Sequence, residues 1–170
     1  MTVQIRPETL TDRQAIRDLN RAAFETEAEA NLVDALRAGG YDKVSMVAVV
    51  ENEIVGHILF SPVLIVTNDG MIDALSLAPL AVLPGDQRQG VGSKLVVEGL
   101  INCRQRGHKI VTVLGHQQFY PRFGFSADLA KSLASPFGGG EAWMALELVP
   151  GCLTGITGRV EYSPPFQVFL

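Results

Sequence analysis

The sequence contains little cysteine, few aromatic residues and little charge. Its 170 residues include two cysteines, Cys103 and Cys152, and 7% aromatic and 19% charged residues. Two cysteines are too few for a disulfide scaffold, and they cannot form a zinc site by themselves. We therefore expect both to be small buried apolar side chains rather than reactive thiols.

Long hydrophobic runs and clusters of basic residues are also missing. The most apolar stretch, residues 72–83, is interrupted by polar residues and is shorter than the about 20 residues of a membrane span. The first residues lack the basic and then apolar pattern of a secretory signal. With 14 Lys and Arg against 18 Asp and Glu, the net charge is −4, and no basic run could follow a phosphate backbone. We expect a cytoplasmic protein without a membrane or nucleic-acid partner.

The hydrophobic residues, 47% of the chain, are enough for a sizeable core, and the length predicts a single domain over residues 1–170. Val3–Arg6 has the composition of a short strand. Two capping-box spacings, Thr11 with Gln14 and Thr26 with Glu29, then predict the starts of two amphipathic helices.

The middle of the chain predicts an antiparallel meander followed by a crossover. Three stretches rich in Val and Ile are separated by turn residues, and they cover residues 44–50, 54–66 and 74–83. Pro79 in the third stretch predicts a bulge or an unpaired edge, because proline cannot donate to a ladder. A glycine-bearing loop, an amphipathic helix to about Arg106 and the strand Ile110–Leu114 then predict one parallel crossover. Further strands are expected near residues 144–149 and 160–162, so the fold class is α+β.

The loop before the predicted third helix carries the clearest chemical signal. Backbone N–H groups at a helix start have no intrahelical partner and lie at the positive end of the helix dipole. Gly90 and Gly92 let a phosphate approach these donors, and Arg88 and Ser93 add a charge and a hydroxyl, so the loop predicts a pyrophosphate cradle. The alternative is that both glycines serve only turns or packing. The segment matches neither the dinucleotide fingerprint nor the P-loop.

Three segments in order carry a resemblance to a known family: Leu80–Pro84, Gln87-x-x-Gly90-x-Gly92 and Phe119–Phe125, which contains Tyr-Pro-Arg-Phe-Gly-Phe. Together they resemble a GCN5-related N-acetyltransferase (GNAT), and the similarity extends from Val3 to Leu148. The resemblance implies the GNAT fold, with a mixed central sheet of about six or seven strands, flanking helices, and a bulged fourth strand splayed from the fifth. The segments are similar to bacterial predicted acetyltransferases with poorly known substrates.

The resemblance implies acetyl-CoA as cosubstrate and no metal. Its pyrophosphate would lie on the loop, whose candidate residues are Gln87, Arg88, Gln89, Gly90, Val91, Gly92 and Ser93. Its pantetheine would pair with Leu80 and Val82 like an added strand, and Ala81 between them is a further candidate cofactor-binding residue. A backbone N–H near Val82 would also stabilise the oxyanion. Gly115 and His116, which follow the fifth strand, complete the candidate cofactor-binding residues.

Catalytic roles are also implied by the resemblance. Tyr120 matches the family tyrosine near the sulfur of CoA. It is either a general acid for the leaving thiolate or a structural residue that covers CoA. The ordinary pKa of a tyrosine is about 10 and that of a thiol about 8.5, so proton transfer is feasible in a dry site. The family has no fixed motif for the base. Glu29 is one candidate, although its capping-box position offers a structural role as well. His116 is the other candidate base, or else a cofactor contact or an ordinary loop residue.

The expected reaction is direct transfer of an acetyl group to a primary amine in a ternary complex, without a covalent enzyme intermediate. Three alternatives stay open at this point: a regulatory module that binds acyl-CoA without turnover, transfer of a larger acyl group, and an interaction protein whose loop binds nothing. The acceptor is a small-molecule or peptide amine, selected by the helices and the Ser135–Gly140 loop, and the acidic charge suits a cationic amine. A homodimer is compatible with the resemblance.

Overall fold

The computed structural model describes residues 2–170, which divide into two compact units. The first unit contains residues 2–60 and 78–102, and the second contains residues 61–77 and 103–170. Strands β3 (Glu53–Thr67) and β4 (Gly70–Val82) pass through both units, so neither unit is one continuous stretch of chain. No helix within residues 2–170 is long and apolar enough to cross a membrane.

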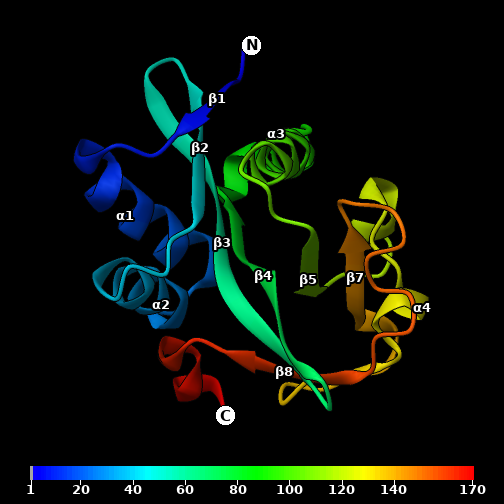
Figure 1. Ribbon diagram of the computed structural model, residues 1–170. Helices are drawn as coiled ribbons and strands as arrows, with labels where there is room; N and C mark the ends of the chain where they lie inside the picture. Colours follow the sequence, from blue (N-terminus) through cyan, green and yellow to red (C-terminus); the bar gives the residue numbers. More distant parts are fainter. Residues whose placement is uncertain (1) are drawn as a thin grey trace. The chain divides into compact units, whose positions relative to one another are not determined.

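The first unit is a sheet with helices on both faces (Figure 1). Its elements are β1 (Gln4–Pro7), α1 (Arg13–Phe24), α2 (Ala28–Ala38), β2 (Val44–Val50), the first part of β3, the last part of β4 and most of α3 (Val91–Gln105). The strands follow the order β1-β2-β3-β4, and β1–β2 and β2–β3 are antiparallel. Helices α1 and α2 cover one face and α3 covers the other.

Local sequence explains how these helices begin and end. In α1 the buried side chains Ile16, Leu19 and Asn20 recur at the three- and four-residue spacing of one helical face. The helix ends where Glu25 takes a left-handed conformation, with φ of 59°, and its N–H bonds to the Arg21 carbonyl. Helix α2 ends at Gly39, whose N–H bonds to the Ala35 carbonyl.

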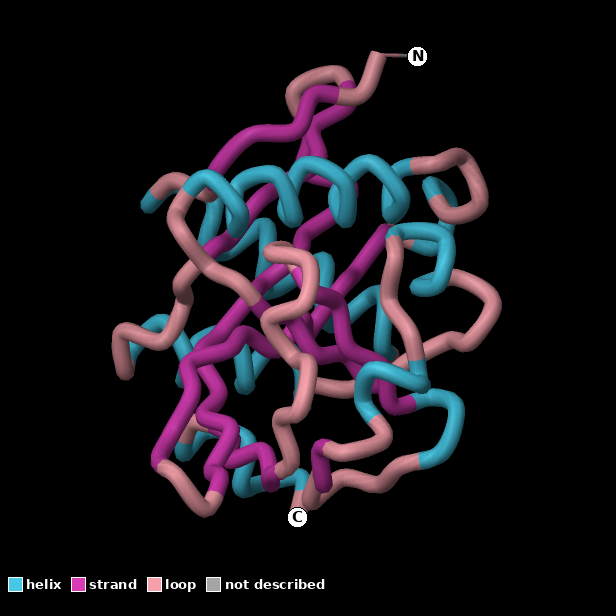
Figure 2. The backbone as a smooth tube through the Cα atoms, turned by 45° about the vertical axis from the view of Figure 1, so that its right-hand side comes forward, coloured by secondary structure: helices cyan, strands magenta, loops and turns pink. Residues whose placement is uncertain are grey.

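Two glycines allow α3 to lie close to β3 on the opposite face of the sheet. A Cβ at Gly56 in β3 would stand 2.8 Å from Leu95 Cδ1, and a Cβ at Gly99 in α3 would stand 2.6 Å from the Phe60 ring. Neither approach leaves room for a side chain. Figure 2 shows α3 from the side, as a straight helix that crosses the strands of this unit.

The second unit contains the other strands and the short helices. Its elements are β5 (Ile110–Leu114), α4 (Ala127–Ala130), β6 (Leu133–Ala134), β7 (Trp143–Glu147) and β8 (Gly158–Tyr162). β4 pairs in parallel with β5, β5 pairs antiparallel with β7, and β8 pairs with both β3 and β6. Ten buried apolar side chains, among them Val63, Ile65, Trp143 and Val160, form its core.

The predicted fold class is confirmed: the protein has a mixed sheet with flanking helices, and β4 and β5 form the expected parallel crossover. The β4–β5 ladder covers only Leu75 with Val111 and Ser76 with Thr112, and it ends before the cis peptide bond Ala78–Pro79. The residues described contain eight strands, because the two-residue strand β6 adds to the number expected. Short 3-10 helices cover Leu10–Asp12, Pro84–Asp86, Tyr120–Phe123, Gly140–Ala142 and, at the end, Pro164–Phe169.

The predicted starts of the first two helices were wrong. The capping box forms two residues earlier than expected, between Thr9 and Asp12, and α1 begins at Arg13. Helix α2 begins at Ala28 rather than at Thr26. There the Thr26 hydroxyl accepts from the Ala28 N–H and donates to the Glu29 carboxylate, so the two side chains bond to each other instead of completing a capping box.

Candidate functional site

The Gln87–Ser93 loop lies in the first unit, between β4 and α3. The Gln87 amide donates to the Val82 carbonyl at 3.0 Å, and the Gln89 amide donates to the Gly85 carbonyl at 3.3 Å. Both glutamine side chains therefore bond back to the segment just before them and fix its conformation. Both side chains therefore stabilise the loop conformation and do not extend away from the loop toward a ligand.

The loop ends in a helix start with several backbone donors. The first α3 hydrogen bond runs from the Lys94 N–H to the Gly90 carbonyl at 3.0 Å. The N–H groups of Val91, Gly92 and Ser93 lie ahead of this bond and have no acceptor within the helix. Arg88 and Gly90 have positive φ values of 62° and 85°, and no heavy atom outside the neighbouring residues lies within 4 Å of a Cβ built on Gly90. The helix dipole makes this open end favourable for an anion.

The remaining candidate cofactor-binding residues of the first unit differ in how exposed they are. Val91 is 1% exposed and its side chain packs against Gly56, so only its backbone is available to a ligand. In β4, Ala81 is buried, whereas Leu80 and Val82 are half-buried. Alternate residues of the strand thus face different surroundings, as a pleated strand requires.

Gly115, His116 and Tyr120 belong to the second unit and form one turn after β5. The Gly115 N–H donates to the Ala142 carbonyl, while the exposed His116 accepts from the N–H groups of Phe119 and Tyr120 through its carbonyl. A Cβ on Gly115 would lie 2.5 Å from the Tyr120 ring. Gly115 therefore leaves the space that the Tyr120 ring occupies. Its position after a strand did not reveal this role.

Tyr120 is held by aromatic neighbours and shielded from water. Its ring meets Phe119 and Phe125 edge to face, with centroids 5.0 Å and 5.6 Å apart. The side chain is 7% exposed, and this burial raises the pKa of Tyr120 to about 12. The phenol is therefore fully protonated at neutral pH, which a general acid requires.

Glu29 lies in the first turn of α2 and is half-buried. One carboxylate oxygen accepts from the Thr26 hydroxyl at 3.0 Å. This contact leaves the other oxygen for a second partner, because an ionised carboxylate can accept several hydrogen bonds. Glu29, the loop and Leu80–Val82 lie in the first unit, and the Tyr120 turn lies in the second.

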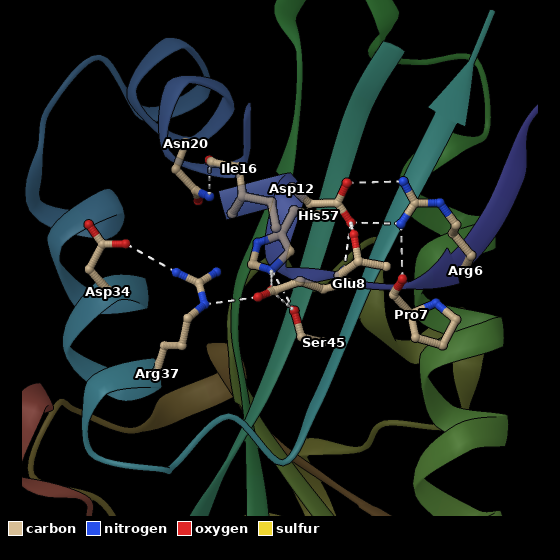
Figure 3. A network of polar contacts seen from close by, with 11 residues as sticks. Arg6, Pro7, Glu8, Asp12, Ile16, Asn20, Asp34, Arg37, Ser45 and His57 are labelled. Carbon is tan, nitrogen blue, oxygen red and sulfur yellow. Dashed lines mark hydrogen bonds and ion pairs between the residues drawn. The ribbon is translucent and has the colours of Figure 1, made fainter. Parts of the chain in front are cut away.

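Sequence reasoning missed a buried network of polar side chains beneath α2 (Figure 3). Glu8, which follows β1, accepts from Arg37 Nε at 2.8 Å and from the Ser45 hydroxyl at 2.5 Å. His57 Nε2 lies 3.0 Å from Ser45 Oγ. The sequence offered no partner for His57, since Glu8 and Ser45 are distant in the chain and only the β2–β3 register places Ser45 near it.

Burial and pairing shift the pKa values in this network. Burial acts to raise the pKa of Glu8, but the nearby His57, 3.7 Å away, and hydrogen bonds from Arg37 and Ser45 outweigh it and lower the pKa to about 2. Burial lowers the pKa of His57 and outweighs the opposing effect of Glu8. Nearby, the guanidinium of Arg6 bonds to Asp12 at 2.7 Å and 3.0 Å and lowers the Asp12 pKa to about 2. The network thus holds an ionised Glu8 and a neutral His57.

Within residues 2–170, no three His, Cys, Asp or Glu side chains are placed to hold one metal ion. The chemistry of the described site candidates is that of backbone donors at a helix start, a protonated phenol and a carboxylate. These groups suit binding of an anionic cofactor and proton transfer.

The fold described above can be compared with those of known protein families. The family profile of the acetyltransferase (GNAT) domain matches residues 4–127. The chain therefore belongs to the GNAT family, and it is an N-acetyltransferase.

Individual relatives extend the similarity over nearly the whole chain. The uncharacterized N-acetyltransferase YhbS of Escherichia coli strain K12 is 36% identical over 167 residues, which are 97% of this chain and 99% of the relative. The crystal structure of E. coli YhbS in complex with CoA has a TM-score of 0.89 at 34% identity, and the match covers 96% of this chain and 91% of that one. A GNAT acetyltransferase from Brucella melitensis in complex with acetyl-CoA has a TM-score of 0.81, also at 34% identity, with 97% and 98% coverage.

Proposed function

We propose that the protein binds acetyl-CoA through the Gln87–Ser93 loop and transfers the acetyl group to a primary amine by direct attack in a ternary complex. The open helix start of α3, with its backbone donors and the unobstructed Gly90, is the observation that carries the proposal. The similarity to solved structures that contain CoA or acetyl-CoA supports it. The acceptor is a small-molecule or peptide amine.

The loop holds the pyrophosphate by its backbone. The N–H groups of Val91, Gly92 and Ser93 donate to phosphate oxygens, and Gly90 keeps the approach free of side chains. Arg88 and the Ser93 hydroxyl add a charge and a further donor. This local arrangement attracts an anion in spite of the net charge of −4, because donors at contact distance outweigh the screened field of distant charges.

The last residues of β4 hold the acyl part of the cosubstrate, which supplies an activated acetyl thioester when bound. Backbone groups of Leu80 and Val82 pair with the pantetheine amides as a neighbouring strand would, with Ala81 buried between them. The Val82 N–H then donates to the thioester oxygen as negative charge develops on it.

Tyr120 donates a proton to the thiolate that leaves. Its pKa of about 12 keeps the phenol protonated throughout the working pH range. In water such a phenol is a weak acid for a thiolate of pKa about 8.5. Burial in a dry site also raises the basicity of the thiolate, since a desolvated anion is less stable, and this brings the two groups closer in acidity.

Glu29 accepts a proton from the acceptor, directly or through water. A free alkylammonium has a pKa of about 10.4 and cannot attack until it has lost a proton. Glu29 is a carboxylate on α2 with one oxygen bonded to Thr26 and a partly open side chain. The exposed His116 is the second candidate for this role.

An assay for free CoA over a panel of primary amines tests the function. The wild type should release CoA in an amine-dependent manner, and Tyr120→Phe should lower kcat by about a hundredfold, within the range for loss of a general acid, with KM for acetyl-CoA little changed. Tyr162→Phe, at a half-buried tyrosine, is the control and should keep its activity. Binding of acetyl-CoA without release of CoA for any amine would instead identify a regulatory module.

A further inference from the structure

Three buried polar atoms beneath α1 and α2 have no hydrogen-bond partner within the protein: Asn20 Oδ1, Arg37 Nη2 and His57 Nδ1. The side chains that carry them come from three elements, α1, α2 and β3. Asn20 and His57 are 0% exposed. A buried polar atom without a partner costs free energy comparable to a lost hydrogen bond, so three of them in one region call for an explanation.

The other polar atoms of the same side chains are all occupied. The Asn20 amide donates to the Ile16 carbonyl at 2.9 Å, which leaves its oxygen as the atom in need of a donor. Arg37 donates through Nε to Glu8 and through Nη1 to Asp34, which leaves Nη2 as a donor in need of an acceptor. The side chains are therefore fixed, and none can rotate to serve its remaining atom without losing a bond that it has.

The protonation of His57 follows from its neighbours. Ser45 has one hydroxyl hydrogen, which it donates to Glu8, so Ser45 Oγ accepts a hydrogen from His57 Nε2. Nε2 also lies 3.7 Å from the Glu8 carboxylate, which favours a hydrogen on that nitrogen. Because burial disfavours the imidazolium, the ring is neutral and Nδ1 carries no hydrogen. Nδ1 is thus an acceptor without a donor.

Figure 3 shows the Asn20 amide, the Arg37 guanidinium and the His57 ring turned toward the same region between α1, α2 and β3. Together they present two acceptors and one donor. We propose that this region is a binding site for one water molecule, which donates to Asn20 Oδ1 and His57 Nδ1 and accepts from Arg37 Nη2. Buried waters with about three hydrogen bonds to otherwise unpaired groups are a regular part of folded proteins.

The donor and acceptor pattern selects water over small ions. Ammonium has no lone pair for Arg37, and chloride has no hydrogen for Asn20 or His57. The bound water joins α1 to the chain of contacts that already runs from α2 through Glu8 and Ser45 to β3. It thereby fixes both helices on the sheet, and this role is separate from the proposed cofactor loop on α3.

A crystal structure of the full chain at a resolution that shows ordered solvent tests the site. It should contain one water within about 2.7–3.2 Å of all three atoms. The proposal is overturned if no solvent density lies there, or if the three groups bond directly to one another or to other side chains.

A double-mutant cycle tests the same claim in solution. Asn20→Leu and His57→Leu should each lower the Tm, and the double variant should lose clearly less than the sum of the two, because the second change acts on a water site that is already lost. Asn20→Leu combined with Gly99→Ala, on the opposite face of the sheet, is the control pair and should give additive losses. Additive losses for Asn20→Leu with His57→Leu would contradict a shared water; if these variants do not fold, the crystal structure decides.

Discussion

At the scale of single residues, burial shifts the pKa values of Tyr120 and His57 in opposite directions. It raises the pKa of the Tyr120 phenol to about 12 and lowers the pKa of the His57 imidazole, and in both cases it favours the neutral form. Glu8 is the exception, because the hydrogen bonds from Arg37 and Ser45 and the nearby His57 overcome burial. The proposed acid therefore keeps its proton, while the structural network keeps the Glu8 carboxylate ionised beside the Arg37 guanidinium.

Acid should weaken the fold through His57 first and Glu8 afterwards. The lowered pKa of His57 provides stability above its ordinary value of 6.5, and this stability is lost as the pH falls, because the unfolded chain binds a proton that the folded chain binds less readily. Glu8 adds a second loss between its ordinary 4.5 and about 2. Melting curves over pH should show the Tm difference between wild type and Glu8→Gln constant above pH 6.5, where His57 and Glu8 do not titrate in either state, and shrinking below pH 4.5. A difference that is independent of pH down to 3 would contradict the assignment.

What the sequence reveals of the site depends on how local each signal is. The loop from Gln87 to Ser93 is contiguous, so its motif and its place at a helix start were predictable. The pairing of Glu8 with His57 was not, because it depends on strand register and on the packing of α2. The same holds for the contact between Gly115 and the Tyr120 ring, which a turn of 3-10 helix creates.

At the scale of elements, the contact between α3 and β3 positions the proposed phosphate loop. Gly56 and Gly99 allow this helix and strand to approach, and Val91, the first residue of α3, packs against Gly56 in the same contact. The open helix start is therefore anchored by the core directly beneath it. Rigid support of this kind is what an anion site made of backbone donors needs.

Gly99→Ala should destabilise the protein, although alanine is the better helix former by about 1 kcal/mol. The added methyl would stand 2.6 Å from the rigid Phe60 ring, and overpacking of this kind costs about 1–3 kcal/mol. Chemical denaturation should show a lower free energy of unfolding. Gly85→Ala, where no neighbour lies within 4 Å, is the control and should be near neutral. A gain in stability for Gly99→Ala would show that the contact is looser than described.

Most elements were predictable because their periodicity is strong, and the ends of the helices were less so. The strands β2 and β5 have their predicted bounds. The starts of α1 and α2 differ from the predicted ones because threonine hydroxyls have several possible local partners. At α1, Thr9 and Asp12 form the capping box in place of Thr11. The short elements α4 and β6 gave no periodic signal, since four and two residues are too few to show one.

At the scale of the whole molecule, the path of the chain indicates a single folding domain. Strands β3 and β4 each contribute residues to both compact units. Neither unit can be separated without cutting two strands, so we expect one folding domain over the whole chain.

Calorimetry can test the single domain directly. The full chain should unfold in one transition, with the calorimetric enthalpy equal to the van't Hoff enthalpy, as two-state domains do. Two resolved transitions, or a van't Hoff enthalpy well below the calorimetric one, would show that the two units unfold separately.

Binding of acetyl-CoA to the Gln87–Ser93 loop is the central claim, and thermal shift measures it most directly. At 100 times its Kd, acetyl-CoA should stabilise the wild type by about 2.7 kcal/mol, which corresponds to roughly 5–11 °C for a chain of this size. The double variant Gly90→Glu with Gly92→Glu should show no shift, because two carboxylates at the helix start repel the pyrophosphate. Gly85→Glu, which adds a carboxylate just before the loop, should keep the shift. No shift for the wild type at millimolar acetyl-CoA, or an equal shift for the double variant, would contradict the account.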